Sequence, residues 1–131
     1  MILLVFPVLF SCKKKVDEVK QDALVDLMVS GQWAVTSFTI NSNDITADFS
    51  GYKFQYYRDK TVSAIKNNVV EKTGTWDGDI ATRTTWANFN LPPYPLGMIN
   101  GSWNIVDSGL TYVIASQTSG TDVKIMRLDK I

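Results

Sequence analysis

The chain has 131 residues, 45% of them hydrophobic, and 13 basic residues balance 13 acidic ones. This length and composition predict one compact domain, and the balanced charge gives no basic surface for nucleic acid. With no histidine and one cysteine, the chain cannot form a Ser-His-Asp triad or an internal disulfide, and we expect no metal site, no cofactor and no enzymatic activity.

The N-terminus begins with an apolar run, residues 2–10, which is too short for a transmembrane helix but has the length of a signal-peptide core. Ser11 and Cys12 follow, and then three lysines. This segment resembles the lipobox of bacterial lipoproteins, in which a small residue precedes a cysteine that is acylated and becomes the new N-terminus. The resemblance implies that residues 1–11 are a signal peptide and that an acylated Cys12 holds the protein at a lipid bilayer.

Two other interpretations of this segment remain open. It can be a buried first strand with a structural cysteine, although the abrupt change to Lys13 argues against it, or an uncleaved membrane anchor. In similar lipoproteins the residue after the cysteine selects the membrane, and lysine there favours the outer membrane, facing either the periplasm or the cell surface. No lysine or arginine lies between Met1 and Cys12, which suggests that the natural chain starts upstream of Met1.

Residues 12–30 are predicted to form the lipidated cysteine, a tether and a short helix. Asp17 is a candidate N-cap, and Ser30 with Gly31 is a typical stop. We expect the apolar stripe of this helix to pack against the domain that follows; binding of a partner is the alternative. The stripe consists of Val16, Val19, Ala23, Leu24, Leu27 and Met28.

After Gly31 the sequence changes to short segments rich in β-branched and aromatic residues, separated by turn residues. Asp77-Gly78 is predicted to be a hairpin turn, and the proline-rich residues 90–101 an irregular segment. Eight short strands with mostly short connections predict an all-β, antiparallel up-and-down barrel in preference to a sandwich. The predicted strands cover residues 32–40, 52–57, 61–66, 69–76, 80–91, 102–106, 110–117 and 121–128.

Residues 27–131 look like the small lipocalin-like (calycin-type) barrels of bacterial lipoproteins. Gly31-Gln32-Trp33 resembles the Gly-x-Trp that opens the first lipocalin strand, and residues 74–76, 96–103 and 128–130 resemble further features of the bacterial subgroup. The resemblance implies a lipocalin-like barrel over residues 31–131, with Trp33 buried at its closed end and Arg127 lying across it. If the face of Arg127 points outward, this arginine is a surface charge instead.

Two functions compete. The first is a membrane-tethered carrier that binds a small hydrophobic molecule in or at the mouth of the barrel, and the second is a non-catalytic cell-envelope interaction module or inhibitor with a filled barrel. The loop over residues 92–101 could cover a ligand, plug the barrel or contact a partner. We favour the carrier, and the candidate ligand-contacting residues are Tyr52, Phe54, Tyr56, Trp86, Tyr94, Met98 and Tyr112.

Two pairs of carboxylates lie close together in the sequence, Asp44 with Asp48 and Asp77 with Asp79. Such pairs can bind calcium or exchange protons, but aspartate is also a common turn residue. We therefore assign both pairs to turns.

Overall fold

The structure is a computed structural model, and it describes residues 19–131. Within these residues the chain forms a helix over residues 19–29, one antiparallel sheet and two short 3-10 helices. The 3-10 helices are η2 (Thr46–Phe49) and η3 (Leu96–Met98). The strands are β1 (Trp33–Ile40), β2 (Asn43–Asp44), β3 (Tyr52–Tyr56), β4 (Thr61–Lys66), β5 (Val69–Asp79), β6 (Thr84–Phe89), β7 (Gly101–Ser108), β8 (Tyr112–Ser119) and β9 (Asp122–Lys130).

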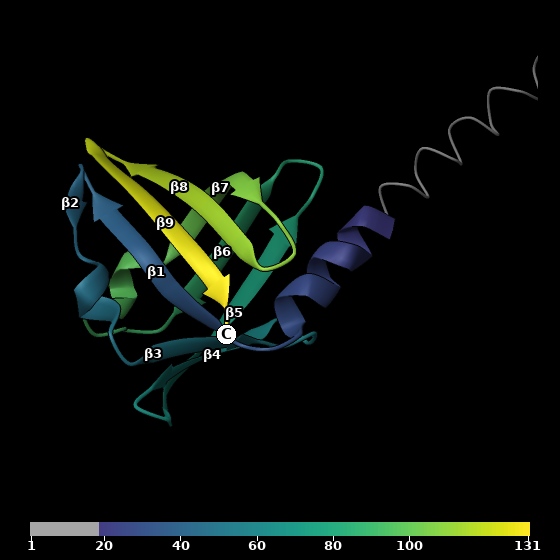
Figure 1. Ribbon diagram of the computed structural model, residues 1–131, viewed down its shortest axis with the longest axis horizontal. Coiled ribbons are helices and arrows are strands. Elements are labelled where there is room, and N and C mark those ends of the chain that lie inside the picture. Colours follow the sequence, from purple (N-terminus) through teal and green to yellow (C-terminus); the bar gives the residue numbers. More distant parts are fainter. Residues whose placement is uncertain (1–18) are drawn as a thin grey trace, which may run out of the picture.

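The sheet closes on itself, so the predicted eight-stranded antiparallel barrel is confirmed (Figure 1). Each of the long strands pairs with its neighbour in sequence, and β1 pairs with β9 from Trp33–Lys130 to Ile40–Lys124. The two-residue β2 only extends the end of β1. The junction between β1 and β3 is the shortest, with Trp33 opposite Phe54.

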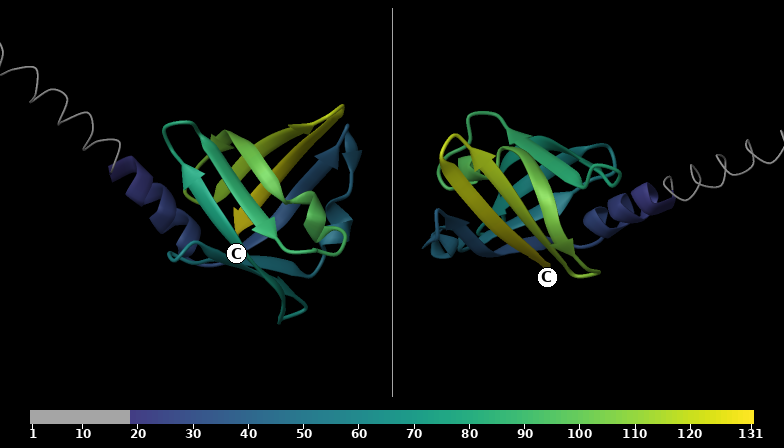
Figure 2. Two further views of the ribbon diagram at one scale, coloured as in Figure 1. Left: turned by 180° about the vertical axis from the view of Figure 1, so that it is seen from behind. Right: turned by 90° about the horizontal axis from the view of Figure 1, so that it is seen from above.

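The two ends of the barrel are covered by different elements. The helix over residues 19–29 lies at the end where β1 begins and β9 finishes, which we call the helix end, and η2 and η3 lie at the opposite end, the loop end (Figures 1 and 2). At the loop end, Leu96 and Ile99 are buried, and Phe49 stacks on Phe38 with ring centroids 4.9 Å apart. Of the three roles expected for this loop, plugging the barrel is therefore the one that the fold shows.

The predicted hairpin turn at Asp77-Gly78 is wrong. Strand β5 continues through both residues to Asp79, and the turn to β6 falls at residues 80–83. Gly78 gives the helix room instead: a Cβ there would lie 3.2 Å from a methyl carbon of Leu24, closer than an ordinary contact. The local preference of Asp-Gly for a turn is overridden because the glycine makes room for the helix.

The helix packs on the barrel as predicted, but through a different stripe. Val25 and Met28 are buried, whereas Val19 is 66% exposed and Ala23 is also exposed. Gln21 also faces the barrel, and its side chain contacts the backbone of β5. The buried face of the helix is therefore rotated relative to the apolar stripe read from the sequence. The helix ends at residue 29 before Gly31, whose φ of +79° fits the predicted stop. Cys12, Val16 and Asp17 lie outside the described residues.

None of the helical segments among the described residues has both the length and the apolar character needed to cross a membrane.

Candidate ligand-binding cavity

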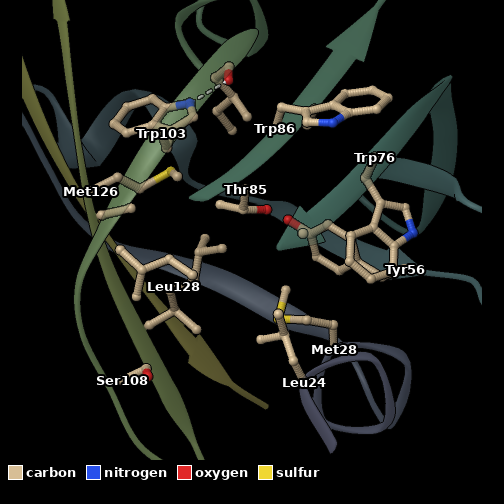
Figure 3. A pocket seen from close by; sticks show the side chains of 16 residues that line it. Leu24, Met28, Tyr56, Trp76, Thr85, Trp86, Trp103, Ser108, Met126 and Leu128 are labelled. Carbon is tan, nitrogen blue, oxygen red and sulfur yellow. Dashed lines mark hydrogen bonds between the residues drawn. The ribbon is translucent and has the colours of Figure 1, made fainter. Parts of the chain in front are cut away.

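A cavity of about 40 Å³ lies in the barrel at the helix end (Figure 3). Most of its walls come from β5 to β9, with Tyr56 of β3 and Ile99 after η3, and Leu24 and Met28 of the helix cover it. The remaining lining residues are Trp76, Gly78, Thr85, Trp86, Ala87, Trp103, Ile105, Ser108, Val113, Ala115, Met126 and Leu128.

Small side chains create this space. Side chains of a strand alternate between the two faces of the sheet, so Gly78, Ala87 and Ala115 face inward at positions where larger residues would fill the interior. Gly78 lies opposite Thr85 in the ladder. The half of the interior next to β1, β3 and η2 has large inward residues instead, including Phe54 and Phe38, and is packed with aromatic rings.

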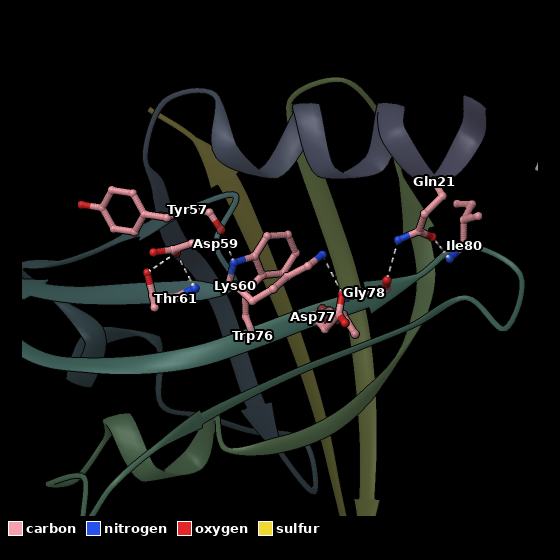
Figure 4. A network of polar contacts seen from close by, with 10 residues as sticks. Gln21, Tyr57, Asp59, Lys60, Thr61, Trp76, Asp77, Gly78 and Ile80 are labelled. Carbon is pink, nitrogen blue, oxygen red and sulfur yellow. Dashed lines mark hydrogen bonds and ion pairs between the residues drawn. The ribbon is translucent and has the colours of Figure 1, made fainter. Parts of the chain in front are cut away.

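The helix is fixed over the cavity by polar contacts (Figure 4). The Gln21 side-chain amide donates to the Gly78 carbonyl at 2.7 Å and accepts from the Ile80 amide at 2.8 Å. Gln21 thereby supplies hydrogen-bond partners to the backbone at the end of β5, as a neighbouring strand would. At the other end of the helix, the buried Trp33 indole donates to the Met28 carbonyl at 3.0 Å.

A second polar network supports the outer side of the cavity wall (Figure 4). Lys60 lies 5.2 Å from the centroid of the Trp76 ring and forms an ion pair with Asp77 at 3.0 Å. Partial burial acts to raise the pKa of Asp77, but the hydrogen bonds from Lys60 and the Gly78 amide outweigh it, and the pKa lies below its usual value. The Trp76 indole donates to the Tyr57 carbonyl at 2.9 Å. These contacts hold Trp76 in place as a rigid wall.

Two of the predicted ligand-contacting residues, Tyr56 and Trp86, line the cavity. Tyr56 projects from the end of β3, whereas the Trp86 indole points away from the cavity and 36% of the residue is exposed (Figure 3). Tyr52 and Phe54 share the inward face with Tyr56, as the alternation predicts, but they stack on each other in the packed half with centroids 6.2 Å apart.

The structure places the other three candidates away from the cavity. Tyr94 is 59% exposed and its hydroxyl donates to Asp48 at 2.6 Å. Met98 lies in η3 and packs partly against the core. Tyr112 faces outward on β8, because its neighbour Val113 takes the inward position.

The predicted contact between Arg127 and Trp33 is wrong. Trp33 is fully buried, as expected, but Arg127 is on the outer face and lies over Tyr112, 4.7 Å from the ring centroid. Inward positions on β9 belong to Met126 and Leu128, so the alternation puts Arg127 outside. Arg127 is therefore a surface charge, which was the alternative given for an outward-pointing face.

Sequence reasoning missed most of the cavity. Leu24 and Met28 were expected only to pack against the domain, and Trp76 and Trp103 were not among the candidate ligand-contacting residues. That Met126 and Leu128 share one face of β9 is readable from the sequence. The space left by Gly78, Ala87 and Ala115 cannot be predicted without knowing which strands face each other across the barrel.

The paired aspartates serve turns and local contacts. Asp44 accepts hydrogen bonds from the amide and the hydroxyl of Thr46, and Asp79 accepts from the amide of Ala81 at 2.9 Å. Among residues 19–131 no cluster of metal-binding side chains is present.

Together these features define a closed antiparallel β-barrel with a small apolar cavity beneath an N-terminal helix. No protein-family model and no curated protein sequence matches the chain. It is similar to the crystal structure of a DUF4847 family protein from Bacteroides vulgatus ATCC 8482, with a TM-score of 0.57 and 16% sequence identity. The match covers 81% of this chain and 96% of that one. At this identity the similarity shows the shared fold alone.

Proposed function

We propose that the protein binds a small apolar molecule in the cavity at the helix end of the barrel. The observation that carries this proposal is the contrast between the two halves of the interior. The half next to β1, β3 and η2 is filled by packed aromatic rings, whereas the half beneath the helix keeps an apolar space lined by Ala87 and Ala115. Packed protein interiors leave few such voids, and an enclosed apolar space is the usual kind of place for a small ligand to bind.

The size of the cavity limits the ligand. Its 40 Å³ is well below the roughly 150 Å³ of an engineered apolar cavity that binds benzene. A short molecule, or one end of a longer one, fits this space. A larger ligand requires Leu24 and Met28 to move with the helix, which is held by a few contacts rather than by a strand ladder.

We further propose that an acylated Cys12 tethers the domain to the outer membrane. The support is the apolar run of residues 2–10 followed by Ser11 and Cys12, which resembles a lipobox. The described part of the chain starts with the helix that covers the cavity, so a tether would join the domain through this helix.

The interaction module remains the second candidate, and a specific observation favours it. Leu91 is 83% exposed beside the plug at the loop end, and Tyr94 is 59% exposed in the same loop. Large exposed apolar side chains in one loop are typical of a protein contact. In this alternative the partner is another cell-envelope protein and the barrel is a filled scaffold.

Titration with a fluorescent apolar probe, together with native mass spectrometry, tests ligand binding. Ala115→Leu adds three carbon atoms inside the cavity, and Ala34→Leu makes the same change on the outer side of β1. We expect the wild type and Ala34→Leu to bind the probe and Ala115→Leu to lose binding while circular dichroism shows a folded barrel. If the wild type binds no probe and carries no co-purifying molecule, the carrier is excluded and the interaction module stands.

A further inference from the structure

We infer that the cavity selects an uncharged molecule that carries one hydrogen-bond acceptor, such as a ketone, ester or ether, beside an apolar body, and that the Tyr56 hydroxyl is the donor to it. This inference rests on the proposed function and names the chemical class of the ligand.

Tyr56 is a buried residue whose hydroxyl has no hydrogen-bond partner among the described residues. The residue is 7% exposed, and its ring packs edge-on against Trp76 with centroids 5.2 Å apart. The hydroxyl points into the cavity on the side of Thr85 (Figure 3). Within residues 19–131, no hydrogen bond forms to this hydroxyl, and burial alone accounts for the raised pKa of Tyr56. No fully buried side-chain nitrogen or oxygen of the described residues lacks a partner, so the Tyr56 oxygen keeps accessible surface and is open to a ligand on the cavity side.

The other buried polar groups around the cavity are already bonded within the protein. The Trp103 indole donates to the Ile99 carbonyl at 2.8 Å, and the Trp76 indole donates to the Tyr57 carbonyl. The Thr85 hydroxyl donates to the Asp77 carbonyl at 3.0 Å. Because these indole and hydroxyl groups already donate to backbone carbonyls, the Tyr56 hydroxyl is the donor that remains for a ligand in the buried part of the cavity.

Charged ligands do not fit this environment. Of the residues that line the cavity, all within the described part of the chain, none is charged. A buried carboxylate or ammonium needs a counter-ion, and one phenol cannot replace it. The nearby cation Lys60 is on the outer side of Trp76 and is paired with Asp77. Since its pKa is raised, the Tyr56 phenol stays protonated at neutral pH and remains a donor.

A series of small probes of nearly equal shape tests the inference. They are about as large as benzene, so we expect Leu24 and Met28 to move with the helix when a probe binds. 2-Pentanone has the carbonyl acceptor, 2-methyl-1-pentene replaces the oxygen with a methylene group, butyrate is the anion of the same outline, and butylammonium is a cation of similar size. Dissociation constants of the full-length protein come from amide NMR titrations that follow Gly78 and Thr85, which line the cavity. Tyr56→Phe removes the donor, and Tyr57→Phe is the matched control because Tyr57 is 41% exposed and outside the lining.

We expect Tyr56→Phe to weaken 2-pentanone by about 3- to 10-fold, the usual effect of one neutral hydrogen bond, without weakening 2-methyl-1-pentene. Tyr57→Phe should change neither, and butyrate and butylammonium should bind least. The carbonyl ¹³C resonance of bound 2-pentanone should also shift downfield in the wild type and lose that shift in Tyr56→Phe. This second measurement tests the hydrogen bond even if the variant is less stable.

Equal effects of Tyr56→Phe on the ketone and the alkene would overturn the inference and leave cavity binding intact, as would tighter binding of either charged probe than of 2-pentanone. If the wild type binds neither the ketone nor the alkene, the proposed function itself fails and the inference fails with it.

Discussion

Lys130 lies across the buried indole of Trp33, with its Nζ atom 5.4 Å from the ring centroid. The two residues are directly opposite each other in the β1–β9 ladder that closes the barrel. Lys130 also donates to the Ser30 hydroxyl at 2.7 Å, beside the end of the helix. The cation therefore joins three parts of the fold at the helix end: the first strand, the last strand and the segment between the helix and β1.

Trp33→Ala should destabilise the protein by about 3 to 5 kcal/mol, as expected for a large core truncation. Trp33 is fully buried, and the variant also removes the donor to the Met28 carbonyl. The free energy of unfolding from urea denaturation provides the measurement. Trp33→Phe, which keeps most of the apolar contact, should lose clearly less. A loss below about 1 kcal/mol in Trp33→Ala would contradict its role in the core.

A double-mutant cycle should find coupling between Trp33 and Lys130 but not between Trp33 and Arg127. The expected coupling for the first pair is about 0.5 to 1 kcal/mol, the range of a cation-aromatic contact at a partly exposed site. Trp33→Leu, Lys130→Met and Arg127→Met are suitable variants because they remove the aromatic ring or the charge and keep apolar bulk. Significant coupling to Arg127 would instead support the contact that the lipocalin resemblance implies.

Gln21→Ala should loosen the helix from the barrel and lower stability by about 1 to 3 kcal/mol, since two partly buried hydrogen bonds are lost. The Ile80 amide loses its acceptor, so its hydrogen exchange should become faster than in the wild type. Asp22→Ala, on the exposed side of the same helix, is the control and should leave this exchange unchanged. Unaltered protection of Ile80 in Gln21→Ala would show that the helix is held by its apolar residues alone.

Stability should fall in acid partly through Asp129. Its carboxylate accepts two hydrogen bonds from Arg127, at 2.9 and 3.1 Å, and these are the main cause of a pKa below the usual 3.8. A lowered folded-state pKa means that the contribution is complete above pH 3.8 and disappears as the pH falls through the lower folded value.

We therefore expect Asp129→Asn to be less stable than the wild type at pH 7 and the difference to shrink as the pH falls below 3.8, as followed by urea denaturation at a series of pH values. Arg127→Ala should show the same convergence. A difference that is independent of pH would mean that Asp129 acts through its shape and not its charge.

Cys12→Ala should abolish partition of the protein into detergent when it is expressed in a bacterium that processes lipoproteins. The wild type should lose residues 1–11 and gain the mass of an acylated cysteine, because the segment resembles a lipobox. Phase partitioning and mass spectrometry of both proteins provide the measurement, and Ser11→Ala, which keeps a small residue, should behave like the wild type. Continued partition of Cys12→Ala would contradict lipidation.

The sequence by itself determined the class of fold. Alternating segments such as Tyr52 to Tyr56, separated by turn residues, specify strands with one buried face, and short connections leave a meander that must close to protect its edges. The stop of the helix before Gly31 was predicted from local patterns, and the burial of Trp33 was implied by the resemblance of Gly31-Gln32-Trp33 to the lipocalin motif; both are confirmed. These features depend on residues near one another in the chain, and for that reason they are readable without coordinates.

The tertiary structure decided which residues meet across the barrel. Gly78 belongs to a strand and not to a turn because Leu24, far away in the sequence, packs against it. Arg127 points outward because the closing ladder turns Met126 and Leu128 inward. The cavity depends on the same long-range register: it exists because small residues of separate strands face one another beneath a helix, and no local pattern records which residues face each other once the sheet has closed.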